Sequence, residues 1–329
     1  MGAMTLLITG AGGFVGRHAV AEARARGHRV LALVRRAGAV QLGWQDDEGV
    51  TPVIADLAKP SAALNDAVAS ADAVIHAAAS MEGARAETDT IEATRVLTAA
   101  VCSAEPVPAL ILVSSLSVYS GTALREGAVL TESSALEQEP DLRDAYCGAK
   151  LRQETLCREA MRGRGRLTIL RPGAIWGAGR LWNGHLGQPL GPTLVLMEKA
   201  GQVPLCHVTR AAEALVSAAE TAPRTEVFNI LDDDLPNRAR YVATLQAGGW
   251  PRFVLPFSWR ILAGAARLAA LVPGLPERLP GLLRRPVLAA RMMPLGYDGR
   301  AGAEALRLRR QPVFDDLMSD ALHGGARHG

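Results

Sequence analysis

A tyrosine and a lysine four residues apart are the pair in this sequence best suited to acid–base chemistry. Tyr146 and Lys150 lie in a stretch with a helical pattern that begins near Ala145, so both side chains should lie on one helical face. A tyrosine hydroxyl has a pKa near ~10, and a nearby ammonium stabilises the phenolate, so the hydroxyl can exchange protons with an alcohol or a carbonyl. Ser115, at the end of an apolar run, can hydrogen-bond the same substrate oxygen. The spacing alone is common, because an exposed helix face can carry the same two residues.

A glycine-rich turn near the N-terminus predicts that the protein binds a dinucleotide. Residues 9–16 read TGAGGFVG, and Gly10, Gly13 and Gly16 follow a strand-like run and open a helical pattern. Glycine is needed where the chain turns sharply and where backbone approaches a diphosphate, and the helix N-terminus offers N–H groups to the phosphates. We expect Phe14 and Val15, in the same turn, to contact the cofactor as well.

Two arginines after the second apolar run favour one cofactor over another. Arg35 and Arg36 stand where an NAD-selective site would usually place an acidic residue against the ribose hydroxyls. Because a guanidinium can pair with a 2′-phosphate, we expect NADP(H) rather than NAD(H), although NAD(H) stays open and a solvated basic loop would look the same. The remaining expected cofactor contacts are Asp56 and Leu57 at the adenine and Ala77, Ala78 and Ala79 beside the ribose.

The elements that must position these residues alternate between short apolar runs and helical stretches. The apolar runs LLITG, VLALV, VIAD and AVIHAAA are interspersed with expected helices at 15–26, 61–70 and 88–104, and further apolar runs follow at 109–115 and 167–173. Successive βαβ units of this kind predict an α/β fold with a Rossmann-type, doubly wound parallel sheet. We expect residues 1–172, joined by 206–231, to form the dinucleotide-binding domain, and 173–205 with 232–329 to form a smaller, discontinuous substrate-binding part.

The order of these motifs resembles the extended short-chain dehydrogenase/reductase superfamily, and within it the NAD-dependent epimerase/dehydratase group. The resemblance covers nearly the whole chain and rests on TGAGGFVG, the DL at 56–57, HAAA at 76–79, VSSLSVY at 113–119, YCGAK at 146–150, RPGAIWG at 171–177, HVTRAAEA at 207–214 and VFNI at 227–230. It implies that Tyr146 is the acid/base, that Lys150 is its electrostatic partner and a ribose contact, and that Ser115 polarises the substrate oxygen. It also implies that Pro172 and Gly173 border the nicotinamide, and that a homodimer can form through the helices near 90–104 and 146–160.

The sequence departs from the family pattern at three places. Thr90 stands where family members usually have asparagine, and the Thr209–Arg210 pair replaces a common aspartate. Leu116 and Ser117 replace the acidic pair of sugar 4,6-dehydratases, so we do not expect dehydration.

The substrate side is less defined by its sequence. The loop after RPGAIWG is polar and aromatic and either lines a sugar pocket or forms a surface connection. The expected substrate contacts are Ser117, Trp176, Arg180, Asn183 and Arg210, and Arg224 is a further candidate for a phosphate. Residues 253–293 are amphipathic and basic. We expect them to pack on the sheet rather than touch a membrane, with an interfacial lid as the alternative, and prolines 256, 273, 276 and 280 exclude a spanning helix.

Composition narrows the class of protein further. The 36 Lys and Arg residues nearly balance 33 Asp and Glu, and a net charge of +3 is too small to indicate a nucleic-acid partner. Four cysteines without a CxxC pair or metal-ligand spacing indicate a reduced compartment, no disulfide and no metal site. Because the N-terminus lacks the pattern of a secretory signal, we expect a cytoplasmic protein with a small-molecule substrate.

Three functions remain open on these residues. The first is an NAD(P)-dependent epimerase or keto-reductase acting on a nucleotide sugar by hydride transfer. The second is an NADPH-dependent ketone reductase or hydroxysteroid-type dehydrogenase on a less polar substrate, favoured by Arg35 and the apolar C-terminal region. The third is a non-catalytic dinucleotide sensor, which would not need Tyr146, Lys150 and Ser115.

Overall fold

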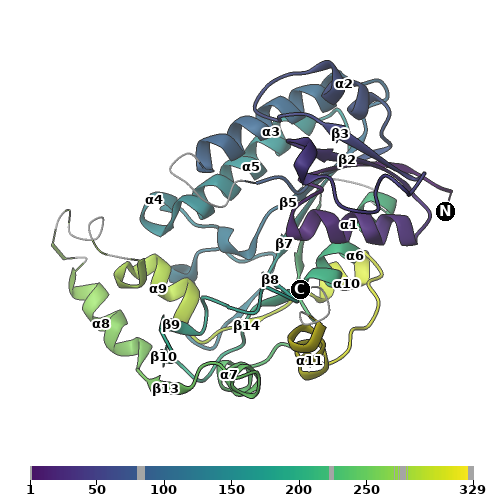
Figure 1. Cartoon of the computed structure of the whole chain (residues 1–329). Coiled ribbons are helices and arrows are strands. Elements are labelled where there is room, and N and C mark those ends of the chain that lie inside the picture. The colour runs from purple at the N-terminus through teal and green to yellow at the C-terminus, as the bar shows by residue number, and fades with distance from the viewer. Residues whose placement is uncertain are drawn as a thin grey trace.

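A seven-stranded parallel sheet forms the centre of the protein (Figure 1). The computed structural model describes residues 2–79, 86–221, 226–269, 271, 272, 274, 279 and 281–324, so that Arg224 and prolines 273, 276 and 280 lie outside it. The strands run in the order β12-β7-β5-β4-β1-β2-β3. Their bounds are β1 Thr5–Thr9, β2 Arg29–Val34, β3 Val50–Ile54, β4 Ala73–His76, β5 Ala109–Val113, β7 Leu167–Pro172 and β12 Glu226–Ile230. The predicted doubly wound sheet is confirmed.

Helices cover both faces of this sheet, which is why its strands are apolar without alternation. On one face lie α1 Phe14–Ala25 and α6 Val208–Thr221, and on the other α2 Ala62–Ala69, α3 Ala86–Ser103 and α5 Ala145–Met161 (Figure 1). Strand β1 shows the alternation of direction: Leu6 and Ile8 pack under α1 and α6, whereas Leu7 packs under α2, α3 and α5. All of these side chains are fully buried.

Residues 129–143 and the second half of the chain add smaller sheets and helices beside the carboxyl ends of the strands. Strand β8 Ala174–Trp176 pairs with β11 Leu205–His207, and β6 Val129–Leu130 pairs with β14 Gly296–Tyr297. A three-stranded sheet joins β9 Gly187–Leu190, β10 Thr193–Leu196 and β13 Phe253–Pro256. The helices of this part are α4 Pro140–Arg143, α7 Arg238–Ala247, α8 Trp259–Ala269, α9 Arg285–Met292, α10 Arg300–Ala305 and α11 Phe314–Gly324. Within the described parts of the chain, no helix combines the length and the apolar character needed to cross a bilayer.

The parallel strands bring the segments that follow them, which hold several predicted site residues, to one edge of the sheet. Thr9 ends β1, His76 ends β4 and Val113 ends β5, and these strands are neighbours in the order β5-β4-β1. In open α/β sheets ligands bind beyond the carboxyl ends of the strands, at the point where the strand order reverses. That point lies between β1 and β4 here, so the glycine turn and the Tyr146 helix α5 are both placed next to it.

Candidate active site

The glycine turn between β1 and α1 has the close backbone contacts that a dinucleotide cradle needs. Gly10 has a φ of +67°, and a Cβ there would lie 2.9 Å from the Cα of Ala78. A Cβ on Gly16 would lie 2.1 Å from the carbonyl oxygen of Gly10. The residue before α1 is Gly13, and no side chain caps the first N–H groups of the helix. These groups are therefore available to a diphosphate, and the turn fits a dinucleotide.

Replacing Gly16 by alanine should damage this turn. Because the new methyl group would overlap the Gly10 carbonyl, we expect Gly16→Ala to lower the free energy of unfolding by about 1–3 kcal/mol and to weaken NADPH binding at least about tenfold, the equivalent of ~1.4 kcal/mol. Urea unfolding and isothermal titration calorimetry measure the two effects. Gly281→Ala is the control, since a Cβ at Gly281 meets nothing within 4 Å. Unchanged NADPH binding by Gly16→Ala would contradict the assignment.

The other predicted cofactor residues lie around the same turn. Arg35 and Arg36 follow β2 directly, are exposed, and make no ion pair among the described residues. Asp56 is exposed after β3, and Ala78 donates its N–H to Thr9 Oγ1 beside Gly10. The structure places the remaining ones as follows: Phe14, Val15, Ala77 and Ala79 are half-buried, whereas Leu57, Pro172 and Gly173 are buried.

Tyr146, Ser115 and Lys150 come together where α5 crosses the end of β5. Lys150 is 4% exposed, and its Nζ donates to the carbonyl oxygen of Val113 at 2.8 Å. The same Nζ lies 5.9 Å from the centroid of the Tyr146 ring. Burial raises the pKa of Tyr146, and a hydrogen bond to the Ser115 side chain acts against that rise. Burial lowers the pKa of Lys150 to about 8. At neutral pH the tyrosine is therefore neutral and the lysine mostly charged, as a proton donor and its cationic support require.

A buried chain of hydrogen bonds connects Lys150 to the glycine turn, and the sequence analysis missed it. Gln153 Oε1 accepts from Lys150 Nζ at 2.8 Å, and Gln153 Nε2 donates to Thr94 Oγ1 at 2.8 Å. Since the Thr94 hydroxyl donates to a backbone carbonyl, its oxygen accepts from His76 Nε2 at 3.1 Å. His76 Nδ1 then accepts from the Thr9 hydroxyl at 2.9 Å. These hydrogen bonds together fix the neutral Nε2–H tautomer of His76 and orient the Lys150 ammonium.

The buried histidine in this chain should make stability sensitive to acid. Burial, with a smaller contribution from Lys150, lowers the pKa of His76 to about 3, whereas a histidine in the unfolded chain has a pKa near ~6.5. The unfolded chain therefore binds more protons between these two values, and stability falls as the pH drops through that window. At pH ~5 we expect a loss of about 2 kcal/mol from this group.

The contribution of His76 can be isolated by comparing two pH values. The free energy of unfolding is measured in urea at pH 7 and at pH 5. Its decrease between the two pH values should be about 2 kcal/mol smaller in His76→Asn than in the unsubstituted protein. Groups other than His76 contribute equally to both proteins and cancel. An identical pH dependence in the two proteins would mean that His76 has the same pKa in the folded protein as in the unfolded chain.

Two residues predicted to contact a substrate lie in the interior instead. Trp176 is 1% exposed, and its Nε1 donates to Asp232 Oδ2 at 2.8 Å. Asn183 is 4% exposed, and its Oδ1 accepts from the backbone N–H of His185 at 2.9 Å. The prediction is wrong for both side chains, because polar groups that are buried need partners inside the protein.

Arg210 is a third correction. Its side chain is 1% exposed, and its guanidinium pairs with Asp233, donates to the carbonyl of Arg309 at 2.8 Å and donates to Gln311 Oε1 at 3.0 Å. A buried guanidinium with these partners holds the C-terminal segment against α6 and has no donor directed at a ligand site. The sequence could not show this, because Asp233 is 23 residues away and Arg309 and Gln311 are 99 and 101 residues away.

Arg180 and Ser117 keep positions that suit a ligand contact. The Arg180 guanidinium is exposed and lies 5.2 Å from the centroid of the Phe14 ring, and its charge acts against the rise that burial causes in the pKa of Tyr146. It therefore lies between the glycine turn and the tyrosine. Ser117 Oγ is buried and has no hydrogen-bond partner among the described residues, so it can still bond to a ligand.

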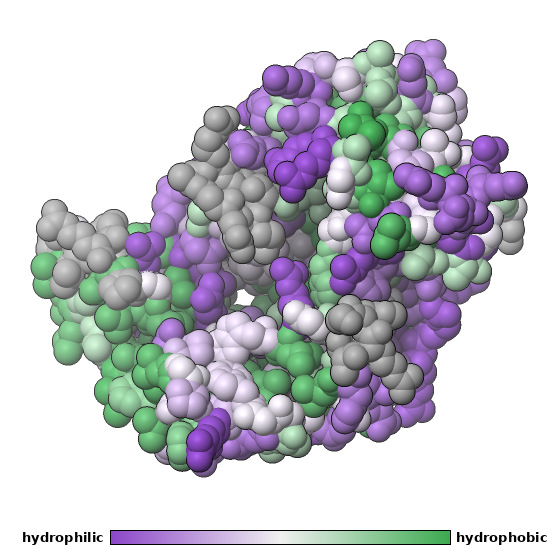
Figure 2. All heavy atoms as spheres, in the orientation of Figure 1, coloured by the Kyte–Doolittle hydropathy of each residue, from purple (hydrophilic) through white to green (hydrophobic). Residues whose placement is uncertain are grey.

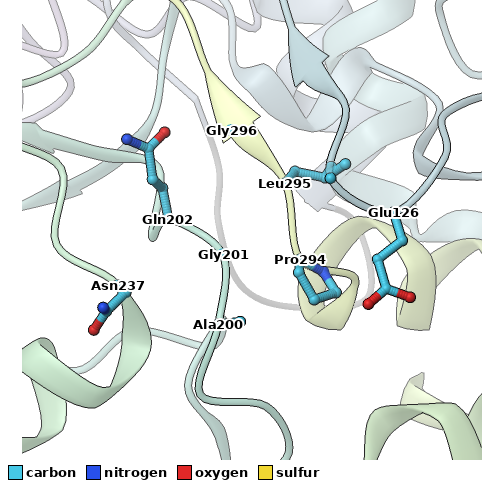
Figure 3. A pocket seen from close by; sticks show the side chains of 9 residues that line it. Glu126, Ala200, Gly201, Gln202, Asn237, Pro294, Leu295 and Gly296 are labelled. Atoms are coloured by element: carbon cyan, nitrogen blue, oxygen red, sulfur yellow. The ribbon is translucent and has the colours of Figure 1, made fainter.

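A separate groove lies between the segments 126–127, 200–202 and 294–296 (Figure 3). It has a volume of about 650 Å³ and is lined by Glu126, Gly127, Ala200, Gly201, Gln202, Asn237, Pro294, Leu295 and Gly296. Its amides serve the backbone: Gln202 Oε1 accepts from Tyr297 N at 2.9 Å, and Asn237 Oδ1 caps α7. None of the predicted site residues lines it, so we place the chemistry at Tyr146 and not in this groove.

Comparisons with known proteins identify the family to which the chain belongs. The NAD dependent epimerase/dehydratase family matches residues 6–230. A 4-hydroxy-2-methyl-3-oxo-4-farnesyl-3,4-dihydroquinoline-1-oxide ketoreductase of Stigmatella aurantiaca is 29% identical, over 92% of this chain and 96% of the relative. A 2-alkyl-3-oxoalkanoate reductase of Stenotrophomonas maltophilia (strain K279a) is 30% identical, over 85% of this chain and 84% of the relative.

Solved structures share the fold at lower identity. UDP-N-acetylglucosamine 4-epimerase from Bacillus cereus is 16% identical with a TM-score of 0.70, over 99% of this chain and 100% of that one. UDP-glucose 4-epimerase from Bifidobacterium longum, solved in complex with NAD+ and UDP, is 17% identical with a TM-score of 0.71, over 98% of each chain. The chain is thus an NAD-dependent oxidoreductase or epimerase, and it belongs to the NAD-dependent epimerase/dehydratase family.

Proposed function

We propose that the protein is an NAD(P)H-dependent reductase of a ketone carried on an apolar carbon skeleton. The observation that carries this proposal is the neutral Tyr146, whose hydroxyl is hydrogen-bonded to the Ser115 side chain and whose ring centroid lies 5.9 Å from Lys150 Nζ. A neutral phenol beside a cation is suited to donate a proton to a carbonyl oxygen. The substrate class is supported by the two reductases that are 29% and 30% identical, whose names give a farnesyl and an alkyl oxo compound.

Each residue has a separate role in this reaction. Ser115 orients the ketone oxygen, and Tyr146 donates its proton to that oxygen. Lys150, held by the Val113 carbonyl and Gln153, stabilises the phenolate that remains. The nicotinamide, when bound, supplies the hydride. The alcohol product therefore gains one hydride and one proton.

The interior positions of the polar residues favour a ketone over a nucleotide sugar. The sugar hypothesis depended in part on the polar loop after Trp176. Asn183 of that loop is buried with a partner inside the protein, and so are Trp176 and the candidate phosphate contact Arg210. Among the predicted arginines that the structure describes, only Arg180 is exposed near Tyr146. The described part of the site therefore offers few polar contacts to a sugar nucleotide.

The experiment is a substrate panel combined with analysis of the purified protein. We expect NADPH consumption with 2-alkyl-3-oxoalkanoates and long-chain 3-oxo esters, none with UDP-glucose or UDP-N-acetylglucosamine, and no dinucleotide retained after purification. Retained NAD with interconversion of UDP-sugars would instead support an epimerase. Tight NADPH binding with no turnover of any ketone or sugar would support the sensor hypothesis.

The exposed arginines after β2 should decide the cofactor preference. Arg35 and Arg36 have no ion-pair partner among the described residues and can bind a 2′-phosphate, an interaction worth about 1.5–3 kcal/mol per charged hydrogen bond. We expect Arg35→Ser/Arg36→Ser to raise the KM for NADPH about 10- to 100-fold and to leave the KM for NADH nearly unchanged. Steady-state kinetics with both cofactors measure this. Equal changes in the two KM values would refute a role in recognising the 2′-phosphate.

A further inference from the structure

An apolar surface covers β13, α8 and the residues just after α8. Figure 2 shows hydrophobic residues gathered over β13 and α8, on the side away from the central sheet. Seven large apolar side chains in this surface are 41–79% exposed: Phe253, Leu255, Phe257, Ile261, Leu268, Leu271 and Val272. We call this set the α8 surface. Single exposed apolar residues are ordinary, whereas a contiguous set of this size indicates an interaction site.

Helix α8 does not need this surface in order to pack. Its inner side buries Trp259 and Ala266 against Leu288 and Met292 of α9 and its neighbours. The backbone N–H of Trp259 donates to the carbonyl of Met197 at 2.8 Å, which fixes the start of the helix. Ile261 and Leu268 are seven residues apart, two helical turns, and are 62% and 69% exposed on the outer side. Helix α8 is therefore apolar on two sides. Its inner side is buried against α9, and its outer side is exposed.

The charge of this region indicates what covers the outer side. Between Trp250 and Tyr297 the sequence has seven arginines and one glutamate, a net charge of +6 in a chain whose total is +3. The remainder of the chain is therefore net negative. Arg252 and Arg267 are exposed within the surface, and Arg260 at its border pairs with Glu126 at 2.7 Å. A second copy of the chain would bring two positive faces together, which is unfavourable.

We propose that the α8 surface docks the protein on an anionic lipid bilayer. Apolar side chains of an amphipathic helix insert into the boundary between headgroups and acyl chains, while arginines contact lipid phosphates. The α8 surface offers both features, because the exposed Arg252 and Arg267 lie among its apolar side chains. This docking stands on the exposed residues and their charge, and it does not depend on the proposed reaction.

The position of α8 connects the docking surface with the candidate active site. Helix α9 packs between α8 and α4, where Arg143 Nη1 donates to the Pro286 carbonyl at 3.5 Å. Asp144, the next residue, caps the N-terminus of α5, the helix that carries Tyr146. If the proposed reduction is correct, docking would hold the protein on the bilayer in which an apolar ketone dissolves.

Vesicle flotation with the full-length protein tests the docking. We expect binding to phosphatidylcholine vesicles that contain phosphatidylglycerol, and at least about tenfold weaker binding to vesicles of phosphatidylcholine alone. Each surface arginine should raise the affinity for an anionic membrane about fivefold. Ile261→Glu/Leu268→Glu should weaken binding at least about tenfold. The control is Leu42→Glu/Val313→Glu, which adds the same charges at side chains 103% and 49% exposed outside the surface, and it should bind within about twofold of the unsubstituted protein.

Several outcomes would overturn the proposal. Absence of binding to the phosphatidylglycerol vesicles, or equal loss in the test and control variants, would remove the α8 surface from the interaction. Equal binding to neutral and anionic vesicles would contradict the role of charge. If light scattering showed that the unsubstituted protein is a dimer and that Ile261→Glu/Leu268→Glu is a monomer, the surface would be an interface between two copies. NADPH affinity of the variant, measured in solution, establishes that it is folded.

Discussion

Replacing Tyr146 by phenylalanine is expected to lower kcat by about 10²- to 10⁴-fold, the usual contribution of a positioned proton donor. The substitution removes only the hydroxyl oxygen, so the ring, Ser115 and Lys150 keep their places. NADPH affinity should stay within about twofold, because the glycine turn between β1 and α1 is unchanged. Steady-state turnover with the ketone substrate and calorimetric titration with NADPH measure the two quantities separately.

The matched control carries the same substitution at a tyrosine outside the candidate site. Tyr119 is 2% exposed, and its hydroxyl donates to Asn229 Oδ1 at 2.8 Å. Tyr119→Phe should cost about 1–3 kcal/mol of stability because it leaves Asn229 without this partner, yet it should retain most of kcat. If Tyr146→Phe kept more than a third of the turnover, Tyr146 would not be the proton donor.

Removing the Glu154 carboxylate should have the largest effect on stability. Glu154 and Arg171 are both 4% exposed, and Arg171 donates to the two carboxylate oxygens at 2.8 and 2.6 Å. Ser114 Oγ also donates to this carboxylate, at 2.6 Å. Glu154→Leu leaves a guanidinium buried without its counter-charge, which costs about 3–5 kcal/mol. Urea unfolding at neutral pH measures the loss.

A double variant separates the charge effect from lost packing. Replacing both partners, as in Glu154→Leu/Arg171→Met, removes the unpaired charge along with the ion pair. Buried ion pairs exchanged for apolar residues of similar volume are often neutral in stability, so we expect the double variant to recover most of the loss. A double variant as unstable as Glu154→Leu would show that the pair is needed for packing and not for charge balance.

Features encoded locally could be predicted from the sequence. The strands of the central sheet are continuous apolar runs, and the glycine turn has a spacing that only a close backbone approach explains. Helix α5 was expected to begin near Ala145 and begins at Ala145. These predictions succeeded because each depends on neighbours within a few residues.

Features that depend on distant contacts could not be predicted. Gln153 comes three residues after Lys150, so the two side chains lie on the same side of helix α5. That spacing was the only local sign that Gln153 positions Lys150. Its partner Thr94 comes from α3, and Thr94 accepts in turn from His76 of β4. Trp176 and Arg210 looked available for a ligand because Asp232 and Asp233, which bind them, lie in segments whose position only the fold reveals.

The place of β12 in the sheet has a consequence for protein synthesis. Strand β12 pairs with β7 at one edge, and it is the last strand of the sheet to leave the ribosome. Until residue 230 is translated, β7 presents unpaired N–H and C=O groups along its whole length, and such an edge is a template for aggregation. A truncated nucleotide-binding half that stops at residue 172 would keep that open edge permanently, whereas one that retains α6 and β12 would close it.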